Sequence, residues 1–492
     1  MRLIDTEDHE LHEFVGDAIP IYAILSHTWD EHEEVTYQDF VSKLNAHKKG
    51  WPKIKKTCEL ARNAGIRYAW VDTCCIDKTS SAELSEAINS MYRWYEESQV
   101  CFAFLTEWSA DVEVADSMQR CRWFMRGWTL QELIAPKNIT FFDSVYNIRG
   151  SKVTLIDTIH QATSIDEQLL LGRNSLAAYS IAQKMSWAVS RQTKRTQDEA
   201  YSLLGIFDLN MLLLYGEGAK AFRRLQEEII RSNSDLSIFA WKLPPRPEKL
   251  QIGVVRDSTL CIVLAMSPTD FAGCGETMGE VDGLRDLSMS NIGVKIMTRM
   301  HLRCVQGSKA VLYVLPVAYS CGRFLGIRLR QIGHKQYHRE NPYSLDKYLD
   351  LGSIETVPPV ERYLLTKIPG YLRWSMEHSR FASTSLILSK TRAFVLQFSL
   401  SQDLIISEPW PLYPYDHLEC CFFGPHNSRR DFGTINFLLN AAFPDDPTVT
   451  TKLKCQFIAL GWYNSANDAR FSLIEASMYT DQLASIQTWV TD

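Results

Sequence analysis

The sequence predicts an α/β domain with a mostly parallel sheet, followed by a helical region and a β-rich C-terminal domain. Within residues 1–150, short apolar runs alternate with segments of helical periodicity, and strands that alternate with helices favour a parallel sheet. Residues 151–245 have the apolar periodicity of helices, whereas residues 250–492 contain short strand-like runs between Gly, Pro, Asn and Asp turns. A proline-rich stretch at 243–247 marks the expected start of the last domain.

The α/β domain is predicted to contain four buried strands with helices between them. The strands are expected at residues 22–26, 68–72, 100–105 and 139–142. A helix with apolar residues at helical spacing is expected at residues 53–64, ending before Gly65. The next helix starts after Ser80, which has the spacing of a capping box with Glu83, and carries an apolar stripe over residues 84–95.

The remaining elements are predicted from the same patterns. Helices are expected at residues 177–189, 198–207 and 219–230. Strands are expected at residues 237–241, 260–265, 294–297, 310–315, 324–329, 394–398 and 455–460.

Composition argues against several classes of protein. The chain has 492 residues, a formal net charge of −6 and no long basic run, which disfavours nucleic acid as a partner. The N-terminus lacks the apolar segment of a secretory signal, and the longest apolar stretch, residues 310–319, contains Pro316 and is too short to span a bilayer. The 12 cysteines show no spacing typical of a zinc site. These observations predict a cytoplasmic protein with no membrane span and no metal site.

The segment at residues 122–133 concentrates two tryptophans, two arginines and a carboxylate ahead of Pro136. Trp128 and Glu132 are four residues apart, so on a helix they share one face. An aromatic ring beside a carboxylate suits a ligand that needs both stacking and recognition of hydroxyl groups or a cation. The alternative is a buried tryptophan beside a solvated glutamate on an ordinary helix.

Polar residues also follow the first two predicted strands. Ser26, His27 and Trp29 lie at the end of the first strand, and Asp72 ends the second. Open α/β sheets bind their ligands at this edge, so we expect Ser26, His27 and Asp72 to bind or orient a ligand. His27 and Asp72 lie close together if their strands are neighbours. A hydrolase with a nucleophile in the cysteine pair 74–75 is an alternative, although no protease signature surrounds the pair.

Four segments, taken in order along the chain, resemble the fungal heterokaryon-incompatibility (HET) domain. They are Tyr-Ala-Ile-Leu-Ser-His-Thr-Trp at 22–29, Tyr-Ala-Trp-Val-Asp-Thr-Cys-Cys-Ile-Asp-Lys at 68–78, Trp-Thr-Leu-Gln-Glu-Leu at 128–133 and Leu-Leu-Leu-Tyr-Gly-Glu-Gly at 212–218. The resemblance covers about residues 22–241. It implies a parallel sheet similar to the flavodoxin-like sheet of the Toll/interleukin-receptor (TIR) fold. It also implies a role in nonself recognition that ends in programmed cell death.

The same resemblance implies a chemistry. Catalytic TIR domains cleave NAD at the nicotinamide–ribose bond with the glutamate of a W-x-x-x-E helix, and Trp128 and Glu132 match that spacing. On this basis Glu132 is catalytic, Trp128 or Trp29 stacks on a ring of the substrate, and Arg126 contacts a phosphate. NAD is the candidate substrate, and no cofactor is implied.

Three functions remain open. The first is NAD glycohydrolysis that is switched on by self-association through the HET domain. The acidic turn at 30–34 is then either part of the interface between chains or a solvated loop. The second is a non-enzymatic death-signalling adaptor whose HET domain only binds an unknown protein partner. The third, a nucleotide-binding sensor, is disfavoured because no phosphate-loop motif is present. The C-terminal domain is expected to regulate the HET domain, since it has no clustered carboxylates and no nucleophile motif.

Overall fold

The computed structural model describes residues 1–244, 260–279, 286–304, 311–348 and 360–366, together with separate strands between 391 and 479, apart from residues 31, 45–46, 110–117, 299–300 and 334–335. The chain divides into two compact units. The N-terminal unit comprises residues 1–242, 264–282 and 318–321, and the C-terminal unit comprises residues 243–263, 283–317 and 322–492.

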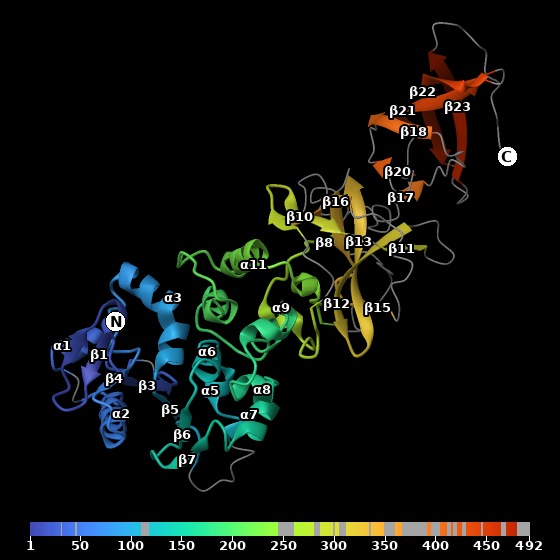
Figure 1. The fold of residues 1–492 in the computed structure, drawn as a ribbon. Coiled ribbons are helices and arrows are strands. Elements are labelled where there is room, and N and C mark those ends of the chain that lie inside the picture. The colour runs from blue at the N-terminus through green and yellow to red at the C-terminus, as the bar shows by residue number, and fades with distance from the viewer. Residues whose placement is uncertain are drawn as a thin grey trace. The chain divides into compact units, whose positions relative to one another are not determined.

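The N-terminal unit is built on a seven-stranded sheet in the order β2-β1-β4-β3-β5-β6-β7 (Figure 1). The inner strands pair in parallel: β4 (Tyr68–Trp70), β3 (Tyr22–His27), β5 (Val100–Phe104) and β6 (Ile139–Phe142). The outer strands pair antiparallel: β1 (Arg2–Asp5), β2 (Leu11–Glu13) and β7 (Ile148–Ser151). The four predicted strands and the α/β class are therefore confirmed, although antiparallel strands extend both edges of the sheet.

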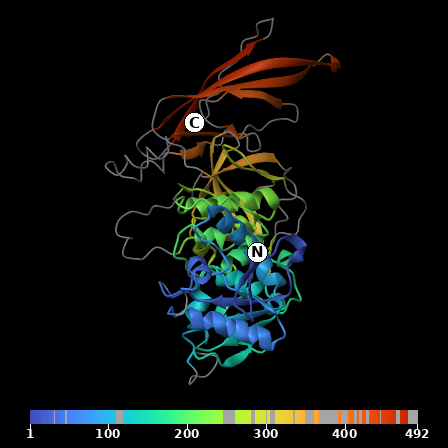
Figure 2. The same ribbon diagram turned by 90° about the vertical axis from the view of Figure 1, so that its left-hand side faces the viewer.

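Helices cover both faces of this sheet. α2 (Trp51–Asn63) contacts β3 and β4, and it lies on the opposite face from α3 (Ser81–Glu97) (Figures 1 and 2). Right-handed crossovers require this arrangement, because β4 and β5 flank β3 on opposite sides. The apolar stripe of α3 packs Trp94 and Tyr95 against Trp70 of β4, with ring centroids 5.6 and 6.0 Å apart. Both predicted helices of the α/β domain are confirmed.

The N-terminus of α3 forms only half of the predicted capping box. The Ser80 hydroxyl accepts a hydrogen bond from the Glu83 backbone N–H at 3.3 Å. The Glu83 carboxylate accepts from the backbone N–H of Asp77 at 2.8 Å and forms an ion pair with Arg2. Glu83 therefore ties α3 to the preceding loop and to β1 and does not cap Ser80.

The segment predicted as one helix before Pro136 is two short helices, α5 (Arg122–Met125) and α6 (Thr129–Ile134). The chain turns at Gly127, whose backbone N–H donates to Gln192 O at 2.9 Å. A Cβ atom at Gly127 would lie 2.5 Å from Cγ2 of Thr193, so the close approach of the two segments requires glycine. Periodicity alone did not predict this break, because the contact comes from residues more than 60 positions away.

A largely helical region follows the sheet, as predicted, but its helices are short. The remaining helices among the described residues of the N-terminal unit are η1 (Gly16–Ala18), α1 (Tyr37–Val41), α7 (Ile156–Thr163), α8 (Glu167–Leu170), η2 (Leu176–Ala178), α9 (Ile181–Ser186), α10 (Asp198–Tyr201), η3 (Gly205–Phe207), α11 (Lys220–Ser232), η4 (Leu236–Phe239) and η6 (Pro268–Phe271). The helices predicted at 177–189 and 198–207 are each divided into an α-helical and a 3-10 segment.

The strand predicted at 237–241 is wrong. Residues Leu236–Phe239 form the 3-10 helix η4, which Asp235 caps by accepting a hydrogen bond from the Ser237 backbone N–H at 2.8 Å. A short apolar run fits a buried helical turn as well as a buried strand, and the capping aspartate decided between them here.

Residues 264–282 belong to the N-terminal unit although they follow the proline-rich stretch. The buried Gln226 side chain of α11 donates to Ala265 O and accepts from Ala265 N–H, both at 2.9 Å. The Ser180 hydroxyl, which precedes α9, donates to Thr277 O at 2.5 Å. These buried contacts make residues 264–282 part of the same fold as the helical region.

The C-terminal unit is rich in β-structure, as predicted. One sheet has the order β11-β12-β13-β14-β16-β10-β9, with β15 beside β13 and β8 beside β14; two further sheets have the orders β17-β20-β19 and β18-β21-β22-β23. The strands are β8 (Leu260–Cys261), β9 (Leu287–Met289), β10 (Gly293–Thr298), β11 (His301–Cys304), β12 (Val311–Ser320), β13 (Arg323–Gly333), β14 (Gln336–Glu340), β15 (Asp346–Tyr348), β16 (Val360–Leu365), β17 (Thr391–Phe394), β18 (Leu404–Trp410), β19 (Tyr415–Asp416), β20 (Cys421–Pro425), β21 (Arg430–Phe443), β22 (Asp446–Tyr463) and β23 (Ala469–Tyr479).

The predictions for this unit have mixed outcomes. The strands expected at 294–297, 324–329 and 455–460 lie within β10, β13 and β22, and that at 310–315 begins β12. The strand predicted at 260–265 is shorter and corresponds to β8. Most of the strand predicted at 394–398 lies outside the described residues, and so does most of the proline-rich stretch at 243–247. Among the residues that the structure describes, no helix is long and apolar enough to cross a membrane.

Candidate functional site

The carboxyl end of β3 is the topological switch point of the parallel strands, because the strands that follow it lie on opposite sides of it. The chain passes from β3 to β4 on one side and then to β5 on the other side. Such a switch point leaves a crevice-forming edge in open α/β sheets, and ligands bind there. Side chains alternate across β3, so Ser26 faces the side of α3 and α6, whereas His27 faces the side of α2.

On the α6 side, Ser26 connects two residues of the segment at 122–133. The Ser26 hydroxyl donates to Glu132 Oε2 at 2.5 Å and accepts from Trp123 Nε1 at 2.7 Å. Ser26 and Trp123 are fully buried, and Glu132 is 8% exposed. Burial raises the pKa of Glu132 to about 7, against the opposing effect of the Ser26 hydrogen bond. The sequence analysis did not predict a role for Trp123, because the W-x-x-x-E spacing indicated Trp128 as the aromatic partner of Glu132.

On the α2 side, His27 lies between a carboxylate and an ammonium group. Its Nε2 is 3.2 Å from Asp72 Oδ1, and its Nδ1 is 3.1 Å from Lys53 Nζ. An ammonium group has only donors, so Nδ1 of His27 accepts and Nε2–H donates to Asp72. The predicted proximity of His27 and Asp72 is therefore confirmed, since β3 and β4 are neighbours.

Two members of this group were not predicted. Lys53 is 7% exposed, and its Nζ donates to Glu34 Oε1 at 2.5 Å. Glu34 belongs to the acidic turn at 30–34, yet its carboxylate points inward and also accepts from the backbone N–H of Asp30 at 2.8 Å. A buried lysine inside an amphipathic helix leaves no distinctive spacing, so only the packing of α2 on β3 identifies it.

Asp72 orients the aromatic ring nearest the switch point. Trp29 Nε1 donates to Asp72 Oδ2 at 3.0 Å, so the two oxygens of Asp72 hold Trp29 and His27 separately. Burial by itself would raise the pKa of Asp72, but Lys78, the His27 hydrogen bond and Arg126 lower it to about 2. Asp72 is therefore an anion at neutral pH.

Two cations flank Trp29. The Lys78 ammonium lies 3.6 Å from the centroid of the Trp29 ring, and Cζ of Arg126 lies 5.7 Å from it. Lys78 is exposed, and Arg126 and Trp29 are half-buried. These contacts place two positive charges beside the half-buried Trp29 ring.

Trp128 lies apart from the Ser26–Glu132 pair. It is half-buried, immediately precedes α6, and hydrogen-bonds through its side chain to Asp198 of α10. The structure thus brings together Ser26, His27, Trp29, Asp72, Arg126 and Glu132, and it places Trp123, not Trp128, beside Ser26.

The turn between α5 and α6 is held by Arg191, which is 8% exposed. Its Nη1 donates to Arg126 O at 2.8 Å and to Thr129 Oγ1 at 2.9 Å. Burial lowers the pKa of Arg191 to about 9, while the charge of Glu132 opposes that shift. Arg191 therefore positions both Arg126 and the start of the helix that carries Glu132.

The cysteine pair does not have the environment of a nucleophile. Cys74 and Cys75 are buried, and Cys75 Sγ accepts from the Val71 backbone N–H at 3.4 Å. Burial raises the pKa of the Cys74 thiol well above its ordinary value, which disfavours the reactive thiolate.

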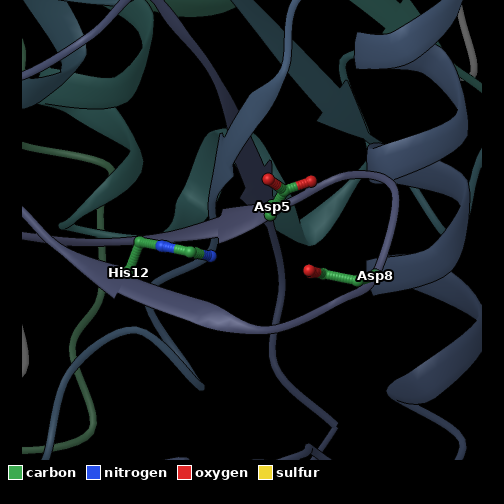
Figure 3. Close-up of side chains that lie close together, drawn as sticks. All are labelled: Asp5, Asp8 and His12. Carbon is green, nitrogen blue, oxygen red and sulfur yellow. The ribbon is translucent and has the colours of Figure 1, made fainter.

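A group of potential metal ligands lies at the turn between β1 and β2. Asp5, Asp8 and His12 each offer one ligand atom, and these atoms lie within 4.8 Å of one another (Figure 3). Asp5 already accepts from Arg67 Nε at 2.8 Å and from the Glu7 backbone N–H at 2.9 Å. Its carboxylate therefore has a structural role in the turn.

Comparison with known proteins identifies two regions of the chain. Residues 22–120 match the family described as Heterokaryon incompatibility protein (HET), and residues 220–299 match a domain of unknown function (DUF8212). The chain is 41% identical over 286 residues to Vegetative incompatibility protein HET-E-1 of Podospora anserina. That match covers 54% of this chain but 21% of the relative. No solved structure matches the chain significantly.

Proposed function

We propose that this chain, which carries a HET domain, acts in the cytoplasm in fungal nonself recognition and programmed cell death by hydrolysing NAD at the nicotinamide–ribose bond. The HET match and the vegetative incompatibility relative support the biological role. The observation that carries the chemistry is Glu132, a buried carboxylate hydrogen-bonded by Ser26 at the switch point of the sheet.

NAD hydrolysis requires the bond between the nicotinamide nitrogen and ribose C1′ to break. The bonding electron pair goes to the cationic nicotinamide ring, which leaves as a neutral molecule and needs little acid assistance. A positive charge then develops on the ribose, and a nearby carboxylate stabilises it. Water adds to C1′ and releases a proton, which ionised Glu132 accepts, because its pKa of about 7 suits a general base near neutral pH.

Other side chains at the switch point fit the rest of the substrate. Ionised Asp72 adds negative charge near the developing cation and holds Trp29 by a hydrogen bond of 3.0 Å. The Trp29 ring suits stacking on nicotinamide, and Lys78 and Arg126 suit the diphosphate. Two carboxylates with opposite pKa shifts are a common arrangement where one acts as a base and the other as a fixed charge.

A TIR-like, flavodoxin-like fold is part of this proposal. The parallel strands have the order β4-β3-β5-β6, which is 2-1-3-4 when they are numbered along the chain. Flavodoxin-like sheets begin with this order. We also propose activation by self-association, in which the turn at 30–34 of one chain contacts another copy. The inward position of Glu34 leaves Asp30 and His32 as the exposed members among the described residues of the turn.

The direct test is to incubate the purified full-length protein with NAD and to measure free nicotinamide. Wild type and Glu132→Gln are compared, with Glu83→Gln as a matched control because Glu83 serves the N-terminus of α3. Nicotinamide release by wild type and by Glu83→Gln, but not by Glu132→Gln, supports the proposal. The absence of release across a wide range of protein concentrations contradicts both the hydrolysis and its activation by self-association.

A second candidate is the non-enzymatic death-signalling adaptor. The observation in its favour is that Glu132 is only 8% exposed and its carboxylate is already hydrogen-bonded, as expected of a structural residue. If Glu132→Gln abolishes cell killing while neither wild type nor the variant consumes NAD, the adaptor is the better account.

The C-terminal unit is proposed to regulate the HET domain. Residues 264–282 pack within the N-terminal unit, so a fragment that tests this idea must extend to residue 282. We expect fragment 1–282 to kill cells more strongly than the full chain when expressed at the same level. A folded fragment that is inert while the full chain kills would show that the C-terminal unit is required for activity.

A further inference from the structure

A second group of aromatic and charged side chains lies on the helical region next to Arg126. We call it the Tyr215 cluster, and it consists of Trp128, Arg195, Asp198 and Tyr215. The Tyr215 hydroxyl donates to Asp198 Oδ1 at 3.4 Å, and the Trp128 side chain also hydrogen-bonds to Asp198. Cζ of Arg195 lies 4.7 Å from the centroid of the Tyr215 ring. The cluster thus combines two aromatic rings, one carboxylate and one cation.

Arg126 connects this cluster to the switch point. Its guanidinium lies 5.7 Å from the Trp29 ring and interacts electrostatically with Asp72, Glu132 and Asp198. Arg126 also lies two residues before Trp128 in the sequence, so the switch-point group and the Tyr215 cluster adjoin along the chain.

Buried and charged side chains hold the loop that carries Tyr215, and this residue is 37% exposed. The hydroxyl of buried Tyr201 accepts from the Leu214 backbone N–H at 2.9 Å and donates to Glu217 Oε1 at 2.7 Å. Nη2 of Arg224 donates to Leu212 O at 2.9 Å. A fixed, accessible aromatic ring loses little freedom when a planar group stacks on it.

We propose that the Tyr215 cluster binds the adenosine half of a dinucleotide whose nicotinamide end lies at Glu132. This inference rests on the proposed function and assigns a second subsite to the same substrate. The adenine base stacks on the accessible Tyr215 ring, which the buried Asp198 carboxylate orients by accepting from the Tyr215 hydroxyl. Arg195 and Arg126 lie where the adenylate and the diphosphate place their negative charges.

The test is the affinity of the full-length protein for 5′-AMP, measured by calorimetry, because this probe contains the adenosine half and requires no turnover. We expect Tyr215→Ala to weaken AMP binding about tenfold, the scale of one lost base–aromatic stack. Tyr215→Phe keeps the ring and should retain most of the affinity. Leu212→Ala is the matched control, since Leu212 lies in the same loop and is 76% exposed. Nicotinamide mononucleotide, which lacks adenosine, should bind wild type and Tyr215→Ala equally.

The outcomes separate this inference from the proposed function. If wild type releases nicotinamide from NAD but does not bind AMP, or binds it equally well with Tyr215→Ala, the adenosine subsite is wrong and the hydrolase remains. If AMP binding depends on Tyr215 but no nicotinamide is released, the nucleotide site is upheld and the hydrolase is contradicted. A loss of affinity that Tyr215→Phe shares with Tyr215→Ala would overturn the stacking role.

Discussion

Glu132 and Asp72 lie at the same edge of one sheet, yet their environments oppose each other. Glu132 is buried beside the neutral Ser26 hydroxyl and the Trp123 indole, and its pKa rises to about 7. Asp72 has Lys78, His27 and Arg126 around it, and its pKa falls to about 2 despite burial. Burial dominates at Glu132, whereas nearby cations outweigh burial at the less deeply buried Asp72. The edge therefore offers one group that exchanges a proton near neutral pH and one that stays charged.

The largest expected effect is on turnover. Glu132→Gln keeps the shape of the side chain and removes its charge and its capacity to accept a proton. We expect NAD turnover to fall by about 10²–10³, the scale of removing one transition-state stabiliser. The rate of nicotinamide release from folded protein measures this. A variant that consumes NAD at the wild-type rate would show that Glu132 is not catalytic.

The second largest expected effect is on the free energy of unfolding, which should depend on pH because Glu132 titrates. The folded pKa is raised, so the contribution of the neutral carboxyl is complete below the unfolded pKa and is lost as pH rises through about 7. This loss amounts to about 3 kcal/mol for a shift of this size. Glu132→Gln removes it, so the variant should be more stable than wild type at pH 8 and close to it near pH 4. Urea unfolding at both pH values tests this, and a constant difference between the proteins would contradict the buried, uncharged state.

Asp72 should behave in the opposite way. Its folded pKa is lowered, so its contribution to stability is present above the unfolded pKa of about 4 and is lost as pH falls through about 2. We expect Asp72→Asn to cost about 2 kcal/mol at pH 7, with a smaller difference in acid. Unfolding measurements at pH 7 and pH 2 check the sign. Equal stability of the two proteins at pH 7 would mean that the interactions of the Asp72 charge with the surrounding cations do not stabilise the folded state.

The smallest expected effect is on the pKa of Glu132, which should depend on the charge of Asp72. The negative charge of Asp72 contributes to the raised pKa of Glu132, after burial. Turnover of wild type should rise with pH through about 7, and Asp72→Asn should move that inflection to lower pH. Profiles of kcat/KM against pH measure the shift. An inflection that stays in place would indicate that the two groups titrate independently.

Much of the candidate site at the carboxyl edge of the sheet was predictable from the sequence, because the local pattern of apolar and polar residues determines where the strands end. The apolar runs that become β3 and β4 end in Ser26, His27 and Asp72, and parallel neighbours bring their carboxyl ends together. The sequence therefore predicts that Ser26, His27 and Asp72 lie together. The spacing of residues 122–133 likewise identified Glu132, although it indicated Trp128 as the aromatic partner.

Tertiary structure decided the rest, because it depends on contacts between distant segments. The turn at Gly127, which Gln192 and Arg191 hold, places Trp123 beside Ser26 and sends Trp128 toward Asp198. Lys53 enters the site only because α2 packs on β3. The sequence thus determined which strand ends carry the polar chemistry, since strand alternation is local. Which aromatic and cationic side chains surround each carboxylate, and hence the opposite pKa values, followed only from burial and packing across the fold.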